Sequence, residues 1–521
     1  MTNQRIGIID VGSNTVRLVI FEIDNYYSMI ELQNIKTPAR LVQYLDDENH
    51  MSQEGIDVLI QIMKSFREIS VRYKIDALLP VATQAIRQAK NADEIVQQIT
   101  AATDIEMRIL TEKEEAYFGN YAVRHTMHYP DGLTVDIGGA STELTLFKNK
   151  EVLHSHSFPF GVVTLKRKFF GGKEHNDPKA IKKAQKFVEE QFKTLDWVPK
   201  AKVPLIGVGG SARNIGEIHQ RQIHYPIAGI HGYEMNREEL ETVFELLKNT
   251  TLEEKEDLDG LSEDRRDIII PAGIVFTTLY DTVKADCFAL SNRGLREGIV
   301  MDYLNREFNN PFSLHDLQKQ TIERTARQYG IRSLGSRQRV AIADKLFTVL
   351  NNEVPLTQDP YLKKLMRFGA YLYFLGSYIG DDSESQHTFY ILSNSNLHGF
   401  NHKDRVRLAL LASFKNKSLF NQYSRDFLGW FSDEELSTLM YLGGIIKFSE
   451  ALNDSHVNIV RDIHLEPSEN KEEYDLYVTY TGDVLSERYR SNKQKKHIER
   501  ILDKSVTVHF TEEPASQEIE Q

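Results

Sequence analysis

A twelve-residue internal repeat constrains the fold of this 521-residue chain more than any other feature. The segment Asp10–Phe21, DVGSNTVRLVIF, aligns without a gap with Asp136–Phe147, DIGGASTELTLF. Asp, Gly, Leu and Phe coincide, and most other apolar positions match in kind. Each copy has the alternation typical of a strand, a glycine turn and a second strand. The repeat therefore predicts two similar α/β lobes whose glycine turns face each other across a cleft.

Further elements follow each copy of the repeat. Apolar residues recur at helical or strand spacing on the C-terminal side of both copies, which is typical of mixed α/β regions. The predicted elements are two strands over 5–23, helices over 52–73 and 92–103, a buried strand over 77–82, two strands over 132–147, a third glycine turn at 207–211 with a helix after it, and a helical region over 265–304.

The chain is too long for a single core, so several domains are expected. The pattern from 314 to 448 is helical almost throughout, and strand-like segments return over 457–463, 474–480 and 506–510. A boundary is predicted near 306–311. The predicted domains are a first lobe over 1–125, a second lobe over 126–305, a helical domain over 306–450 and a small C-terminal α/β region over 451–521 with an acidic tail.

Charge and composition exclude several classes of protein. The net charge of -12 argues against a nucleic-acid partner, and it requires a local basic channel for any polyanionic substrate. The single cysteine, Cys287, excludes an internal disulfide, and its apolar neighbours predict a buried small residue. Asp10 interrupts the first apolar run, so we do not expect that run to be a signal peptide. The longest apolar stretch, 268–280, is too short to span a membrane. We therefore expect a cytoplasmic protein without a membrane partner.

The two glycine turns are candidate phosphate-binding loops. Such turns expose successive backbone N–H groups that form a concave anion site. An ordinary hairpin explains either turn alone, but their repetition favours a site that holds consecutive phosphates. The candidate residues are Gly12, Ser13, Asn14 and Thr15 in the first loop, and Gly138, Gly139, Ala140, Ser141 and Thr142 in the second.

Three acids beside these loops are candidate metal ligands. Asp136 and Glu143 flank the second loop, and Asp10 is the equivalent acid of the first. An aspartate before a glycine is usually a turn former, but its recurrence favours a metal role. Carboxylate oxygens suit Mg²⁺, which keeps several waters and bridges phosphates.

Arg87 and Glu115 have both ordinary and functional explanations. Arg87 follows a buried strand, where its planar fork can hold a phosphate, although most arginines near a helix start are surface charges. Glu114 stands three residues after Thr111, the spacing of a capping box. The capping box gives no structural role to Glu115. Glutamates in an acidic segment such as 112–115 are usually solvated.

In chain order, these motifs resemble the exopolyphosphatase / guanosine pentaphosphate phosphohydrolase (Ppx/GppA) phosphatase family. This family belongs to the superfamily of acetate and sugar kinases, heat-shock chaperones and actin. Each motif alone is weak, and together they are specific. The motifs are Asp10–Asn14, Ala82–Arg87, Glu114–Ala116, Asp136–Glu143, Gly207–Ser211 and Gly294–Gly298.

The resemblance implies two actin-like (ribonuclease H-like) lobes with a cleft between them. It also implies an exopolyphosphatase that releases the terminal phosphate of inorganic polyphosphate with Mg²⁺ or Mn²⁺. Glu115 matches the family's catalytic glutamate and Arg87 a phosphate ligand. Ala140 departs from the family, which usually has a third glycine there; a methyl group is tolerated if the backbone torsions are ordinary.

The second half resembles the helical HD-type domain of longer family members. Tyr373 and Phe374 stand where that domain has its metal-binding His-Asp pair, so we expect a catalytically silent domain that serves homodimerisation or substrate guidance. Basic clusters at 166–168, 182–183 and 488–496 are candidates for guiding a long polyanion.

Three other functions stay open. Guanosine pentaphosphate ends in the same phosphoanhydride as polyphosphate, so the motifs do not separate the two substrates. A kinase or ATPase of the same fold would need an adenine pocket, in which the turn at 207–211 would take part. A non-catalytic sensor would need a broken loop or lost acids, and the sequence has neither.

Overall fold

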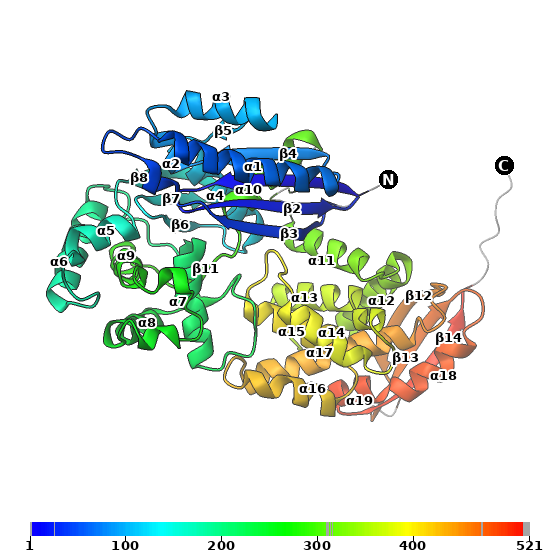
Figure 1. Ribbon diagram of the computed structural model, residues 1–521. Coiled ribbons are helices and arrows are strands. Elements are labelled where there is room, and N and C mark those ends of the chain that lie inside the picture. Colours follow the sequence, from blue (N-terminus) through cyan, green and yellow to red (C-terminus); the bar gives the residue numbers. More distant parts are fainter. Residues whose placement is uncertain are drawn as a thin grey trace. The chain divides into compact units, whose positions relative to one another are not determined.

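The computed structural model describes residues 3–513, except residues 26, 309–311, 313, 315, 470 and 471. Part of the predicted boundary at 306–311 and most of the predicted acidic tail, 514–521, lie outside the described residues. The chain forms two compact units (Figure 1). The first comprises Met1–Tyr225 and Ile230–Leu317, and the second comprises Pro226–Gly229 and Gln318–Gln521.

The first lobe of unit 1 is a five-stranded sheet of order β3-β2-β1-β4-β5. The first three strands are antiparallel, whereas β4 and β5 run parallel to β1. Helices α1, α2 and α3 cover one face of this sheet. The elements are β1 (Gln4–Val11), β2 (Thr15–Ile23), β3 (Met29–Pro38), α1 (Gln53–Arg72), β4 (Ala77–Ala82), α2 (Gln84–Gln88), α3 (Ala92–Thr103) and β5 (Arg108–Ile109).

The second lobe repeats this topology. Its sheet has the order β8-β7-β6-β9-β11, extended by the antiparallel edge strand β10. Strands β6, β9 and β11 are parallel, as β1, β4 and β5 are. The prediction of two similar lobes is therefore confirmed. The strands are β6 (Gly132–Ile137), β7 (Thr142–Lys148), β8 (Glu151–Phe158), β9 (Leu205–Val208), β10 (Glu234–Met235) and β11 (Phe288–Leu290).

One prediction in this lobe is wrong in part. The region 265–304 is not helical throughout, because β11 separates its two helices. All three residues of β11 are buried, and a short buried strand cannot be distinguished from a helix segment by periodicity alone. The helices of this lobe are α5 (Val162–Phe170), α6 (Pro178–Lys193), α7 (Gly209–Gln222), α8 (Arg237–Asn249) and α9 (Ile269–Val283). Helix α10 (Leu295–Glu307) follows β11 and packs with the first sheet.

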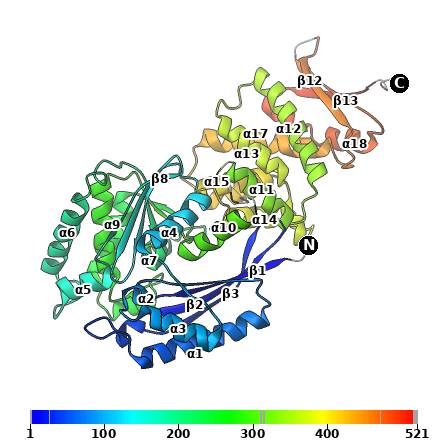
Figure 2. The ribbon, with the colours of Figure 1, turned by 90° about the horizontal axis from the view of Figure 1, so that it is seen from above.

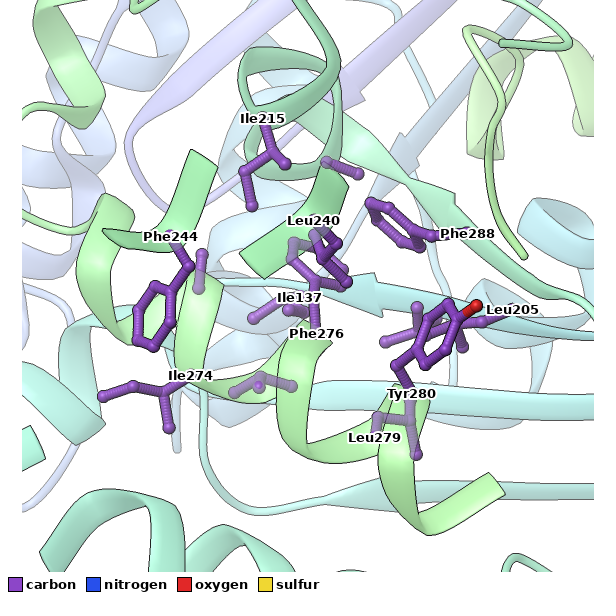
Figure 3. Packing of buried hydrophobic residues seen from close by; sticks show 14 of the residues in the cluster. Ile137, Leu205, Ile215, Leu240, Phe244, Ile274, Phe276, Leu279, Tyr280 and Phe288 are labelled. Atoms are coloured by element: carbon purple, nitrogen blue, oxygen red, sulfur yellow. The ribbon is translucent and has the colours of Figure 1, made fainter. Parts of the chain in front are cut away.

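The largest core lies between the second sheet and its helices (Figure 3). Helix α9 supplies Ile274, Phe276 and Leu279, which pack with Leu205 and Phe288 from two neighbouring strands. This helix is apolar on nearly every side, as expected for a helix surrounded by other elements.

Helix α4 (Glu112–Thr126) belongs to the cores of both lobes. Phe118 and Tyr121 pack in a cluster with the first sheet and α10, whereas Val123 packs in a cluster with the second sheet. Helices α4 and α10 lie side by side (Figure 2). A Cβ atom at Gly298 of α10 would lie 1.9 Å from the carbonyl oxygen of Phe118, so only glycine permits this approach.

Unit 2 is a group of helices followed by a three-stranded sheet, as predicted. The sheet has the order β12-β13-β14, and α18 and α19 connect its two parallel strands. The elements are α11 (Leu317–Gln328), α12 (Ser333–Glu353), α13 (Pro360–Tyr371), α14 (Glu384–Asn394), α15 (His402–Ala412), α16 (Lys417–Ser424), α17 (Asp433–Ala451), β12 (Val460–Pro467), β13 (Glu473–Tyr480), α18 (Leu485–Gln494), α19 (Lys496–Leu502) and β14 (Ser505–Glu512).

Two sets of residues singled out by the sequence lie in this unit. Tyr373 is buried and its hydroxyl donates to the Phe414 carbonyl at 2.9 Å. In the basic segment 488–496, Arg490 pairs with Asp454 at 2.7 Å and Lys495 donates to the Val506 carbonyl at 2.6 Å. These two cations are thus engaged within unit 2, and guidance of a substrate by this segment stays a prediction.

Within the described part of the chain, none of the helices is long and apolar enough to cross a membrane. Nor do any three His, Cys, Asp or Glu side chains of that part form a group that could bind a metal ion by themselves.

Lys255 is a fully buried cation in unit 1. Its Nζ has no hydrogen-bond partner among the described residues, and burial lowers its pKa to about 8. Because this pKa is below that of an unfolded lysine, the unfolded state binds more protons between the two values. The stability of the protein therefore rises with pH above about 8 as this penalty disappears.

We predict that Lys255→Met raises the free energy of unfolding by roughly 1–3 kcal/mol at pH 7, because methionine fills similar space without a charge to desolvate. This gain in stability should shrink as the pH approaches the pKa of a lysine side chain in water. Denaturant unfolding of both proteins at several pH values measures it. A loss of stability at pH 7 would contradict this account of Lys255.

Candidate active site

The two repeated loops are closed by the same hydrogen bond. The Gly12 amide donates to the Thr15 carbonyl at 3.0 Å, and the Gly138 amide donates to the Ser141 carbonyl at 2.9 Å. These residues occupy equivalent positions of the internal repeat. The sequence repeat therefore corresponds to a repeat of backbone geometry.

Neighbouring elements hold the carbonyls of both loops. In the first loop, the amides of Ala39 and Arg40 donate to the Asn14 carbonyl at 2.9 Å. In the second loop, the amides of Val162 and Val163 donate to the carbonyls of Gly138 and Gly139 at 3.0 and 2.8 Å.

A close approach supports the second loop further. A Cβ atom at Gly161 would lie 2.3 Å from the Gly138 carbonyl oxygen, so glycine is required there. No acceptor in the described part of the chain takes the amides of Gly139, Ala140 and Ser141. Ala140 is not among the residues with positive φ, so its methyl group causes no backbone strain.

A cavity of about 330 Å³ lies between the lobes, and both loops contribute to it. Five predicted site residues line it together: Asp10, Gly12, Glu115, Asp136 and Gly138. A second, smaller cavity brings Glu143 together with Glu115 and Asp136. The remaining predicted residues do not line the larger cavity; they are Ser13, Asn14, Thr15, Arg87, Gly139, Ala140, Ser141 and Thr142. Thr142 is fully buried and its hydroxyl donates to the Phe160 carbonyl at 2.7 Å, so it supports the loop from behind.

The acids at the ends of β1 and β6 have different partners. Asp10 is opposite Arg17 on β2, whereas Asp136 is opposite Glu143 on β7. Burial raises the pKa of Asp10, and Arg296, whose Nε lies 3.8 Å from its carboxylate, opposes the rise. Burial also raises the pKa of Asp136, which Arg265 and Arg213 oppose.

Glu143 has acidic neighbours and hydroxyl partners. Burial raises its pKa to about 8, and the nearby carboxylates of Asp136 and Glu115 add to the rise. The Ser157 hydroxyl donates to it at 3.0 Å. The second lobe therefore holds a pair of facing carboxylates with too little positive charge, which is an arrangement that a cation would stabilise.

Glu115 is positioned by its helix and by Arg87. The predicted capping box is confirmed: Thr111 Oγ1 accepts from the Glu114 amide at 3.2 Å, and Glu114 Oε2 accepts from the Thr111 amide at 2.9 Å. Arg87 Nη1 donates to both Glu115 Oε2 and the Leu110 carbonyl at 2.9 Å. Burial raises the pKa of Glu115, and Arg87 opposes this rise.

Four arginines line the larger cavity: Arg213, Arg265, Arg293 and Arg296. The first three lie outside the motifs that the sequence revealed, whereas Arg296 belongs to the motif Gly294–Gly298. A Cβ at Gly210 would lie 2.4 Å from Arg265 Nη2, so this glycine lets the guanidinium lie against the start of α7. Arg265 Nη1 also donates to the Ser211 hydroxyl at 3.0 Å. The sequence did reveal the third glycine turn, at 207–211, and this turn was the only feature that could have pointed to the position of Arg265.

The donor set suits Mg²⁺ better than a metal bound only by protein. Asp10, Asp136 and Glu143 offer carboxylate oxygens, yet they do not form a three-ligand group in the described part of the chain. Mg²⁺ commonly takes one or two carboxylates and completes its shell with water and substrate phosphates. Asp136 and Glu143 fit that requirement.

Comparison with known families decides the class of this protein. The profile of the Ppx/GppA phosphatase family matches residues 19–307, more than half of the chain, and that of Ppx/GppA phosphatase domain III matches residues 317–489. The chain belongs to the Ppx/GppA phosphatase family. Like the enzymes for which the family is named, it is a hydrolase of phosphoanhydride bonds.

Solved structures of Ppx/GppA proteins share the fold. A family member from Aquifex aeolicus is 24% identical, with a TM-score of 0.54 over 59% of this chain and 99% of that chain. An exopolyphosphatase from Cytophaga hutchinsonii is 23% identical, with a TM-score of 0.54 over 58% and 98%. Another Aquifex aeolicus structure is 25% identical, with a TM-score of 0.51 over 57% and 99%. The predicted actin-like fold class is confirmed, and identities this low leave the substrate open.

We predict that Arg87→Lys lowers kcat roughly 10- to 100-fold, because a lysine cannot bond Glu115 and the Leu110 carbonyl with one planar group, and small displacements of a catalytic group are costly. Steady-state phosphate release measures the loss. Arg108→Lys is the matched control, since Arg108 pairs with the neighbouring Glu114. Equal activity of the two variants would show that Arg87 does not position Glu115.

Proposed function

We propose that this Ppx/GppA protein is an exopolyphosphatase, which removes the terminal phosphate of inorganic polyphosphate. The observation that carries the proposal is the composition of the cleft. Two loops of the same geometry and four arginines converge on one cavity, and no aromatic ring is found among the described residues that line it. Such a lining suits successive phosphates better than a nucleoside base, which usually stacks on a ring.

The terminal phosphate would lie against the two loops. It would contact the loops at Gly12 and Gly138, which line the cavity, and the arginines would neutralise the charge of the phosphates that follow. Charge neutralisation and positioning are the main tasks in phosphoryl transfer, because the transition state requires little covalent chemistry from the protein.

Glu115 would act as the general base. Its carboxylate accepts a proton from water as the water oxygen attacks the terminal phosphorus, and the bond to the bridging oxygen breaks. Orthophosphate leaves, and the chain becomes one phosphate shorter. Arg87 positions the carboxylate for this step. Asp136 and Glu143, with Asp10 across the cleft, would hold Mg²⁺, which when bound neutralises charge on the phosphate oxygens.

The test compares phosphate release from long polyphosphate, guanosine pentaphosphate and ATP, side by side with Mg²⁺. We expect long polyphosphate to give the highest kcat/KM. A clear preference for guanosine pentaphosphate would assign the other activity for which the family is named, and a preference for ATP would favour an ATPase.

We predict that Glu115→Gln lowers kcat roughly 10²- to 10⁴-fold with little change in KM, because glutamine keeps the shape but cannot accept the proton. Glu114→Gln is the control, since Glu114 belongs to the capping box. Normal turnover by Glu115→Gln would show that another group is the base.

A chelator should abolish activity, and added Mg²⁺ or Mn²⁺ should restore it, because the facing carboxylates of Asp136 and Glu143 repel the substrate when no cation is bound. Phosphate release is measured before and after the metal is added back. Full activity in excess chelator would contradict the metal assignment.

A further inference from the structure

A row of charged side chains crosses the first sheet beside its glycine loop. Asp10 on β1 is opposite Arg17 on β2, and Arg17 is opposite Lys36 on the edge strand β3. Residues directly opposite each other in neighbouring strands have their side chains on the same face of the sheet. The row therefore starts at the acid that lines the cleft and continues to the edge of the sheet.

This row is on the face of the sheet that packs against α4 and α10. Ile8 of β1 and Val19 of β2 belong to the cluster that includes side chains of those two helices. Side chains two residues apart on a strand share a face, so Asp10 follows Ile8 and Arg17 precedes Val19 on that side. Helices α1, α2 and α3 cover the other face.

Arg17 is close to two cations of the cleft. Burial lowers its pKa, and the nearby guanidinium groups of Arg296 and Arg213 lower it further, whereas nearby acids oppose the decrease. Arg17 Nη1 donates to Asn34 Oδ1 at 3.1 Å, and Asp10 pairs with Arg296 rather than with Arg17. A bound anion at this point would stabilise the charged forms of all three arginines.

Lys36 has a partner from the other lobe that another anion can replace. Its Nζ donates to Asp264 Oδ2 at 3.3 Å, and Asp264 precedes Arg265, which lines the cleft. The side chains of Lys36 and Asp264 are 41% and 56% exposed. An ion pair as exposed as this one contributes little to stability, so a more highly charged anion can compete for the lysine.

We propose that Arg17 and Lys36 bind the phosphates that follow the terminal ones as a polyphosphate chain leaves the cleft across β2 and β3. The phosphates nearest the cleft contact Arg17, and the chain beyond them displaces Asp264 from Lys36. This inference rests on the proposed function. It adds the direction in which the chain leaves and two residues that favour long chains over short ones.

The pair of Lys36 and Asp264 distinguishes this role from a purely structural one. If the pair only holds the two lobes together, loss of either partner has the same effect on substrate binding. If the substrate displaces Asp264, loss of the lysine weakens binding of a long chain, whereas loss of the aspartate strengthens it.

The test measures kcat and KM for long polyphosphate and for tripolyphosphate. We expect Arg17→Gln and Lys36→Gln to raise KM for long polyphosphate roughly tenfold and threefold, because each loses a hydrogen bond to a charged group and Lys36 is the more exposed. The rise should be smaller with tripolyphosphate, which extends less far from the cleft. The kcat values should not change, since neither residue is beside the bond that breaks.

Asp264→Asn should have the opposite effect. We expect it to lower KM for long polyphosphate about threefold, because Lys36 then has no competing carboxylate and a negative charge is removed from the path of the chain. All three effects are electrostatic, so they should become smaller as the salt concentration rises.

Lys64→Gln is the matched control, because it also removes one positive charge from the first lobe. Lys64 is an exposed residue of α1, which covers the other face of the sheet. Its KM should equal that of the unaltered protein at every salt concentration. The melting temperature of each variant shows whether it folds; should Arg17→Gln be unstable, the variants at the exposed positions Lys36 and Asp264 decide.

The outcomes distinguish this inference from the proposed function. Unchanged KM for long polyphosphate in Arg17→Gln and Lys36→Gln would overturn the inference and leave the function intact. A rise of KM in both Lys36→Gln and Asp264→Asn would also overturn it, because the pair then holds the lobes together. Equal rises for long polyphosphate and tripolyphosphate would do the same. An unaltered protein that releases no phosphate from polyphosphate would overturn the proposed function itself.

Discussion

The contact between Gly298 and the carbonyl of Phe118 fixes the helix on which the rest of the site depends. It lets α10 approach α4 more closely than any side chain would permit. Helix α4 then packs into the clusters of both lobes, through Phe118 on one side and Val123 on the other. Because Glu115 is in the first turn of this shared helix, its position relative to both glycine loops is set by core packing rather than by a loop.

The two lobes share one loop geometry but differ in the charged residues beside the loop. The closing hydrogen bond is the same in both loops, yet the residue opposite the acid that begins each copy of the repeat differs. Arg17 faces Asp10, whereas Glu143 faces Asp136. One change at one position of the repeat thus places an acid and a base opposite each other beside the first loop, and two acids opposite each other beside the second. This asymmetry favours anion binding at the first loop and cation binding at the second.

The sequence predicted local features well and spatial convergence poorly. The repeat predicted the shared topology, and the spacing of Thr111 and Glu114 predicted the start of α4, because both patterns are contiguous in the chain. The arginines Arg213, Arg265 and Arg293 were missed, since they come from separate segments and only the fold brings them to one cavity. Thr142 is the converse case. A hydroxyl group suits phosphate binding, so the sequence predicted that role, but the strand directs this hydroxyl to the Phe160 carbonyl. Strand β11 was missed because three buried apolar residues carry no period.

The cleft contains buried acids, whereas the cores of the protein are made of apolar side chains. Burial raises the pKa of Asp10, Glu115, Asp136 and Glu143, which means that the folded state disfavours their charged forms. Arginines offset this for the first three, whereas Glu143 has mainly hydroxyl partners, and its pKa rises to about 8. Under the proposed function, a bound cation would supply the positive charge that Glu143 lacks, and it would offset part of the cost of burying these acids. Under that proposal, the cation would in turn favour binding of the phosphate, because it would remove the negative charge that opposes the phosphate.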